Sequence, residues 1–188
     1  YAKASGIPYG MGLVKNSYVG RTFIQPSQTI RQLGIRLKLN PLREIIEGKR
    51  IVVVDDSIVR GTTLEKSILK LLDKLSPKKI VIVSSAPQIR YPDCYGIDMS
   101  KMKEFVAFRA ALALLNERGL ENILDEVNLR CLAALENGTA MEENFVKAIY
   151  APFTDEEISN KIAVKNRSKC LGIIFDRRRE KLTIKKIQ

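Results

Sequence analysis

The sequence predicts an α/β fold with a mostly parallel sheet flanked by helices, and two observations carry this prediction. Residues 51–54 are four consecutive apolar residues, three of them valine. Such a β-branched run between polar residues is typical of a strand buried on both faces of a parallel sheet. A helix over about residues 63–75 and a strand over residues 78–85 follow. Together they complete a βαβ unit, whose crossover should be right-handed.

The remaining elements are predicted from local patterns. The helix at 63–75 places apolar residues on one stripe, namely Leu64, Ile68, Leu71, Leu72 and Leu75. Thr154 and Glu157 form a capping box that should start a helix over about 155–164. Residues 13–24 fit neither a helix nor a strand well. Further segments are expected as a helical turn at 42–46, a weak helix from Ser27 to about 37, core helices at 105–115 and 123–135, and strands at 170–175 and 181–187.

The chemistry is concentrated directly after the first predicted strand. Asp55 and Asp56 end that strand, and Gly61 precedes the start of the helix. The first turn of a helix has unpaired N–H groups and partial positive charge, so it binds phosphate where a glycine lets the ligand approach closely. Adjacent carboxylates are costly to desolvate unless a cation or ligand hydroxyls compensate them. The segment therefore suits a ligand with a phosphate at one end and a polyhydroxyl ring beside it, with Mg²⁺ as a fitting cation for Asp55 and Asp56.

The acid pair also has simpler interpretations. Two adjacent aspartates alone are as often a helix cap or a solvated turn as a binding site. A phospho-receiver domain would need another isolated aspartate and a later strand-end lysine, which nothing in the sequence marks. The GxxxxGK[ST] pattern of a nucleotide-binding P-loop is absent. The whole string VVVDDSIVRGTT leaves the binding interpretation strongly favoured.

Composition limits the classes of function. The chain contains no histidine, which excludes Ser-His-Asp and Cys-His catalysis within it. Its three cysteines, Cys94, Cys131 and Cys170, form no CxxC pair, so reduced thiols in a cytoplasmic protein are expected. No apolar stretch is long enough to span a bilayer, and no signal peptide is visible.

The net charge of +11 raises the question of nucleic-acid binding. Many basic residues lie within residues 15–43, beside the candidate site, or within residues 177–186, which read as a solvated tail. Aromatic residues that would stack on bases are few, since there is no tryptophan. The basic charge is therefore assigned to a polyanionic small substrate, and nucleic acid is not expected as a partner.

At this point the residues resemble a known family. The string at 52–63 is similar to the phosphoribosyl pyrophosphate (PRPP) motif of type I phosphoribosyltransferases. The flanking strings YVGRTFI and YGIDM narrow the resemblance to the glutamine PRPP amidotransferases, also called amidophosphoribosyltransferases. The resemblance is strong over about residues 1–105, weaker to about 150, and lost beyond. It implies a type I phosphoribosyltransferase fold whose first βα elements are missing from this chain.

The resemblance also implies a reaction and its residues. The family joins ammonia, released from glutamine in a separate glutaminase domain, to C1 of PRPP, which gives 5-phosphoribosylamine in the first step of purine synthesis. Asp55 and Asp56 would hold the ribose hydroxyls, directly or through Mg²⁺. The 5′-phosphate would lie against the residues that follow the acids: Ser57, Ile58, Val59, Arg60, Gly61, Thr62 and Thr63. The residues expected to close over the pyrophosphate or pack over the site are Lys15, Tyr18, Arg21 and Arg31.

The resemblance also implies a domain organisation. Residues 1–150 are expected to form an N-terminally truncated phosphoribosyltransferase domain, and residues 151–188 a C-terminal extension of unknown role. The chain reads as a fragment of a longer polypeptide with a glutaminase domain, so it should be inactive in isolation. A homo-oligomer is expected. Some members bind an iron–sulphur cluster through four cysteines. No cluster is expected here, because only Cys94 lies near one of these positions and the other ligands have no counterpart.

Two other functions are left open by the residues. One is a type I phosphoribosyltransferase that acts on a purine or pyrimidine base. The other is a non-catalytic regulator that senses PRPP and binds RNA or DNA through its basic charge. Turnover of a free base would favour the first, and salt-sensitive nucleic-acid binding without phosphoribosylamine formation would favour the second.

Overall fold

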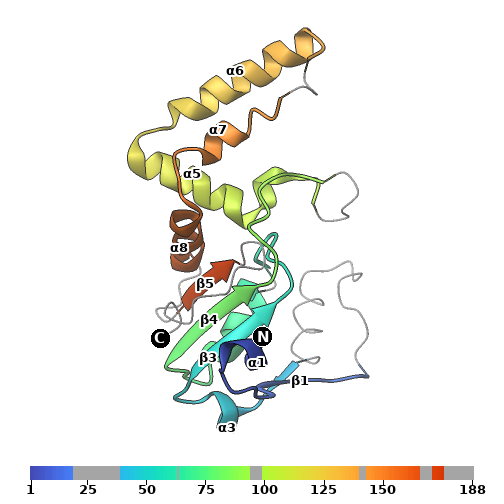
Figure 1. The fold of residues 1–188 in the computed structure, drawn as a ribbon, viewed down its shortest axis with the longest axis vertical. Helices are drawn as coiled ribbons and strands as arrows, with labels where there is room; N and C mark the ends of the chain where they lie inside the picture. The colour runs from blue at the N-terminus through green and yellow to red at the C-terminus, as the bar shows by residue number, and fades with distance from the viewer. Residues whose placement is uncertain (19–38, 63, 94–98, 140–142, 166–170, 176–188) are drawn as a thin grey trace.

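A three-stranded parallel sheet organises the fold. The computed structural model describes residues 1–18, 39–62, 64–93, 99–139, 143–165 and 171–175. The strands are β3 (Arg50–Asp55), β4 (Lys79–Ser84) and β5 (Leu171–Phe175), in the order β3-β4-β5. Both pairings are parallel, and Asp55 lies opposite Ser84. The three arrows point the same way, so their carboxyl ends share the edge of the sheet near α5 (Figure 1).

The central strand and its neighbour differ in burial. All apolar side chains of β4 are buried, at 5% exposure or less, as expected for a strand covered on both faces. The prediction that residues 51–54 are buried on both faces is wrong, because Val54 is 50% exposed and the others are half-buried. The reason is position: among the described strands, β3 is an edge strand that pairs with β4 alone.

The helix between β3 and β4 has an unexpected local geometry. It begins as a π-helix, Leu64–Leu69, and continues as the α-helix α4, Lys70–Asp73. In a π-helix each turn takes about one more residue than in an α-helix. The buried side chains are therefore Leu64 and Leu69, five residues apart, whereas the predicted Ile68 is only half-buried. The predicted stripe resumes at Leu72 and Leu75.

Helices between β4 and β5 complete the core. They are η3 (Met102–Glu104), α5 (Val106–Arg118), α6 (Asn122–Glu136), α7 (Lys147–Tyr150) and α8 (Asp155–Lys165). The long helices α5, α6 and α8 were predicted within a few residues of these bounds. Side chains of α5 and α8 join those of β4 in one apolar cluster. Figure 1 shows α5 lying across the carboxyl edge of the sheet, with α6 extending away from it.

Residues beyond 150 take part in this core. Ile158 and Ile162 of α8 are at most 1% exposed, and β5 pairs with β4 over five residues. The strand expected at 170–175 is thus present as the third strand of the sheet. A domain boundary at residue 150 stays a prediction, and the strand expected at 181–187 lies outside the described residues.

The amino-terminal part forms a small separate sheet. Its elements are α1 (Ala2–Ser5), β1 (Leu13–Lys15), β2 (Leu39–Pro41) and the helical turn α3 (Arg43–Ile46). β1 and β2 pair antiparallel, with Val14 opposite Asn40. This pairing was missed, because residues 13–15 lack a strand pattern long enough to recognise. The weak helix expected from Ser27 lies outside the described residues, and no described helix is long and apolar enough to cross a membrane.

The predicted capping box starts α8. The side-chain oxygen of Thr154 accepts a hydrogen bond from the Glu157 N–H (3.2 Å), and the Glu157 carboxylate accepts one from the Thr154 N–H (2.7 Å). These bonds satisfy two donors that a helix start otherwise leaves unpaired. They also hold the pKa of Glu157 below its ordinary value, with help from Arg118.

Removal of this cap should weaken α8. Thr154→Ala is expected to lower the free energy of unfolding by about 1 kcal/mol, which urea denaturation followed by circular dichroism would measure. Thr139→Ala, in a turn after α6, is the control and should have a smaller effect. Equal losses would show that the cap contributes nothing particular to α8.

Candidate functional site

The acid pair lies where β3 ends. Asp55 is the last residue of the strand, and Asp56 is the first residue beyond it. One carboxylate oxygen of Asp55 accepts a hydrogen bond from the Asp56 N–H (3.0 Å), and Asp56 accepts one in the same way from the Ser57 N–H. Each acid thus caps the residue that follows it, while its second carboxylate oxygen forms no hydrogen bond to another described residue.

The electrostatics of the pair favour a cationic ligand. Burial raises the pKa of Asp55 above its ordinary value, and the neighbouring Asp56 carboxylate raises it further, against the lowering effect of the Asp56 N–H. Neither acid forms an ion pair with another residue in the described part of the chain. Two adjacent carboxylates without a compensating cation fit Mg²⁺, which prefers carboxylate oxygens and keeps several waters.

The loop after the acids presents backbone N–H groups. The Ile58 side chain is 4% exposed and anchors the loop in the core. The N–H groups of Ile58, Val59 and Gly61 donate to no other described residue. Gly61 has φ +69°, and its carbonyl oxygen accepts the N–H of Glu65 (2.9 Å), which closes the first turn of the following helix. Unpaired N–H groups beside a helix start form a suitable site for a phosphate.

The start of α5 supports this loop from behind. The Val106 N–H donates to the Val59 carbonyl oxygen (2.8 Å), and Arg109 Nη2 donates to the Arg60 carbonyl oxygen (2.9 Å). Arg60 in turn pairs with Glu104 through Nε (2.8 Å). These bonds hold the loop through the carbonyl groups of Val59 and Arg60, and they leave the N–H groups of Ile58, Val59 and Gly61 without a partner among the described residues.

Sequence reasoning missed the supporting residues Glu104, Val106 and Arg109. One signal was present, since Arg109 is a single charge inside the apolar run FVAFRAALALL. A charged residue in such a helix needs a polar partner. The pattern could not say that the partner is a carbonyl oxygen of a loop 49 positions earlier in the chain.

Among the described residues, Lys15 and Tyr18 are predicted site residues that form no hydrogen bond or ion pair with the acids. Lys15 is the exposed last residue of β1, and no hydrogen bond or ion pair joins it to the acid loop. The Tyr18 side chain is fully exposed, and its backbone N–H donates to Asn16 Oδ1 (3.0 Å). Thr62 is exposed at the helix start. The remaining predicted positions, Arg21, Arg31 and Thr63, lie outside the described residues.

Gly61 offers a direct test of the loop. Gly61→Ala should strain the backbone at positive φ by about 1–2 kcal/mol and bring the new Cβ to 3.5 Å from the Val106 side chain. Gly48→Ala is a matched control, because Gly48 has φ +65° in open space at another turn. Both variants should lose similar stability on denaturation, whereas only Gly61→Ala should weaken binding of a phosphorylated ligand, measured by calorimetry. Equal binding by the two variants would contradict the loop's role.

Comparison with known proteins agrees with this geometry. Residues 6–107 match the family described as the phosphoribosyl transferase domain, and the chain belongs to that family. The match covers the acid pair, the loop and the first residues of α5. The fold is accordingly that of a type I phosphoribosyltransferase domain.

Similar proteins carry a more particular name. Amidophosphoribosyltransferase from Mycobacterium tuberculosis is 56% identical over 107 residues, which are 57% of this chain and 20% of that protein. The Bacillus subtilis enzyme of the same name is 40% identical over 163 residues, 87% of this chain and 31% of its own. A solved structure of glutamine PRPP amidotransferase from B. subtilis, complexed with ADP and GMP, is 51% identical over 57% of this chain and 23% of its own, with a TM-score of 0.45.

The extent of the similarity has two consequences. The chain spans about a fifth to a third of the length of these curated relatives. The prediction that the resemblance is lost beyond about residue 150 is wrong, because an alignment covering 163 residues of this chain must continue past that point. Residues of α8 therefore fall within the aligned region.

Proposed function

We propose that this chain is the phosphoribosyltransferase part of an amidophosphoribosyltransferase, which forms 5-phosphoribosylamine from PRPP and ammonia. The observation that carries the proposal is the acid pair at the end of β3, followed by a loop in which the carbonyl groups of Val59, Arg60 and Gly61 accept hydrogen bonds while the N–H groups of Ile58, Val59 and Gly61 donate to no other described residue. The relatives named amidophosphoribosyltransferase in bacteria support the same function.

The proposed roles follow the chemistry of PRPP. The free N–H groups of Ile58, Val59 and Gly61 bind the 5′-phosphate, with the hydroxyl of Thr62 beside them. Asp55 and Asp56 accept hydrogen bonds from the ribose hydroxyls. As pyrophosphate leaves, C1 gains positive character, and two nearby carboxylates stabilise that charge electrostatically. Catalysis of this kind depends on positioning and needs no histidine.

Mg²⁺ is the proposed cofactor. Bound to Asp55, Asp56 and the substrate, it would neutralise pyrophosphate charge. Lys15, Arg21 and Arg31 are proposed to supply further positive charge to the pyrophosphate, and Tyr18 to pack over it. The proposed partners are a glutaminase domain that provides ammonia and further copies of the same chain, in the cytoplasm.

Activity of the native polypeptide that contains these residues tests the proposal. With PRPP, Mg²⁺ and ammonium, it should release pyrophosphate and form phosphoribosylamine, and EDTA should abolish the reaction. Adenine, guanine, hypoxanthine, uracil or orotate in place of ammonium should give no turnover. Turnover of one of these bases, or Mg²⁺-independent release, would contradict the proposal.

A further inference from the structure

The acid pair is held from the side by the segment that leaves β4. Beyond the last paired residues of the two strands, the Ser85 N–H donates to the Asp55 carbonyl oxygen (3.0 Å) and the Ala86 N–H to that of Asp56 (2.9 Å). The Ser85 hydroxyl adds a bond to the Asp56 carbonyl oxygen (2.9 Å). These bonds connect the main chain of both acids directly to residues 85–86.

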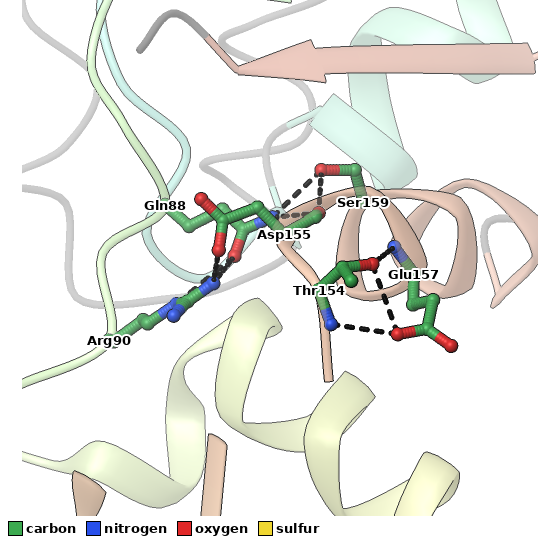
Figure 2. A network of polar contacts seen from close by, with 6 residues as sticks. All are labelled: Gln88, Arg90, Thr154, Asp155, Glu157 and Ser159. Carbon is green, nitrogen blue, oxygen red and sulfur yellow. Dashed lines mark hydrogen bonds and ion pairs between the residues drawn. The ribbon is translucent and has the colours of Figure 1, made fainter. Parts of the chain in front are cut away.

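That segment is in turn anchored to the start of α8. Gln88 Nε2 donates to the Asp155 carbonyl oxygen and to Ser159 Oγ, both at 2.7 Å. Arg90 donates to Gln88 Oε1 through Nε and Nη2, and its Nη2 pairs with Asp155 Oδ1 at 2.5 Å. Figure 2 shows Gln88 and Arg90 reaching from the loop to the first turn of α8. Tyr150 completes the cluster.

Tyr150 holds Arg90 from a second direction. The guanidinium carbon of Arg90 lies 5.1 Å from the centre of the Tyr150 ring, and the Tyr150 hydroxyl donates to the Arg90 carbonyl oxygen (3.0 Å). The Arg90 side chain is only 20% exposed. A guanidinium with a carboxylate, an amide oxygen and an aromatic face around it has a single defined position. Residues 88–90 are thus joined to residues 150–159 by hydrogen bonds, an ion pair and a cation–π contact.

We propose that Arg90 is a positioning residue of the phosphoribosyl site, which transmits the placement of α8 through residues 85–88 to the main chain of Asp55 and Asp56. The inference rests on the proposed function and extends it. It assigns a role in PRPP binding to Tyr150 and Asp155, which lie outside the matched segment 6–107. The start of α8 then acts on the substrate site through residues 85–90.

The chain contains a matched control. Arg118 pairs with Glu157, donates to the Pro152 carbonyl oxygen (3.1 Å) and lies 4.9 Å from the centre of the Phe153 ring. It therefore anchors α8 with the same set of partners as Arg90, namely a carboxylate, a carbonyl oxygen and an aromatic ring. It connects α8 to α5, however, and forms no hydrogen bond or ion pair with the described residues 85–93 after β4.

The test compares Arg90→Met with Arg118→Met in the native polypeptide. Hydrogen exchange should become faster at the Ser85 and Ala86 N–H groups in Arg90→Met and stay unchanged there in Arg118→Met. The KM for PRPP should rise about tenfold in Arg90→Met, since small misplacements of binding groups are costly, and less than twofold in Arg118→Met. Asp155→Asn should resemble Arg90→Met, and the double variant should be no worse than Arg90→Met alone.

The outcomes separate this inference from the proposed function. Equal KM values and equal exchange in the two arginine variants, with an active wild type, would overturn the positioning role and leave the proposed function intact. A wild type that forms no phosphoribosylamine would overturn the proposed function and this inference with it. If Arg90→Met does not fold, Asp155→Asn and Tyr150→Phe carry the same comparison.

Discussion

Asp55→Asn and Asp56→Asn should each lower the ammonia-dependent kcat/KM for PRPP by about 100-fold or more, a loss expected when charge stabilisation is removed from a transition state. An amide is a poorer ligand of Mg²⁺ than a carboxylate and cannot balance the charge that develops at C1. Steady-state pyrophosphate release by the native polypeptide at fixed Mg²⁺ measures the effect. Asp73→Asn, an exposed acid on α4, is the control and should be close to wild type.

Both variants should still fold, and Asp55→Asn should be more stable than the wild type at neutral pH. In Asp55→Asn the amide oxygen can still accept the N–H of residue 56. Because burial and Asp56 raise the pKa of Asp55 above its unfolded value near 3.8, its ionised form destabilises the folded domain, and stability falls as the pH rises through the raised pKa.

Thermal melts check this sign. At pH 7 the Asp55→Asn variant should have a higher Tm than the wild type, and the difference should vanish at a pH below the unfolded pKa. Normal turnover in both asparagine variants would refute the assigned role of the acids. A clear drop in the Tm of Asp55→Asn at pH 7 would show instead that Asp55 is a structural residue.

Phe105→Ala should cause the largest loss of stability, about 3–5 kcal/mol, as expected for removal of a fully buried ring. The Phe105 side chain is 0% exposed directly before α5. Its neighbour Val106 donates to the loop through its N–H, so the cavity should loosen the phosphate site as well. Guanidinium denaturation and PRPP titration measure the two effects.

Phe108→Ala is the matched control for this prediction. Phe108 lies one turn further along α5 and is only half-buried against the core. The same truncation there should cost clearly less stability and leave PRPP affinity unchanged. Equal losses of PRPP affinity in Phe105→Ala and Phe108→Ala would mean that α5 does not support the loop through its first turn.

The sequence predicted those parts of the fold that have a local signal. The apolar run at 51–54, the apolar run at 80–83 within the next strand and the periodic helices each carry their own pattern, and Thr154 with Glu157 marks the start of α8. The position of Asp55 and Asp56 at a strand end followed from the same run. Placement of these elements needed no knowledge of distant contacts.

The missed features all depend on contacts between distant segments. No local pattern shows that β3 lies at an edge of the sheet. Nor does one show that the buried side chains Leu64 and Leu69 are five residues apart, as in a π-helix, and not four. The bonds of Arg109 to the loop and of Arg90 to Asp155 join residues 49 and 65 positions apart. Such pairs have no periodicity, so the supporting half of the candidate site could be found only in three dimensions.

The carbonyl oxygens of Asp55 and Asp56 accept hydrogen bonds from the peptide N–H groups of Ser85 and Ala86. Every residue except proline has a peptide N–H, so most substitutions of Ala86 should keep its hydrogen bond to the Asp56 carbonyl oxygen. Proline alone removes the donor. A mutational scan should therefore find that position 86 tolerates most residues but not proline. This is the result expected when a contact is made by the main chain alone.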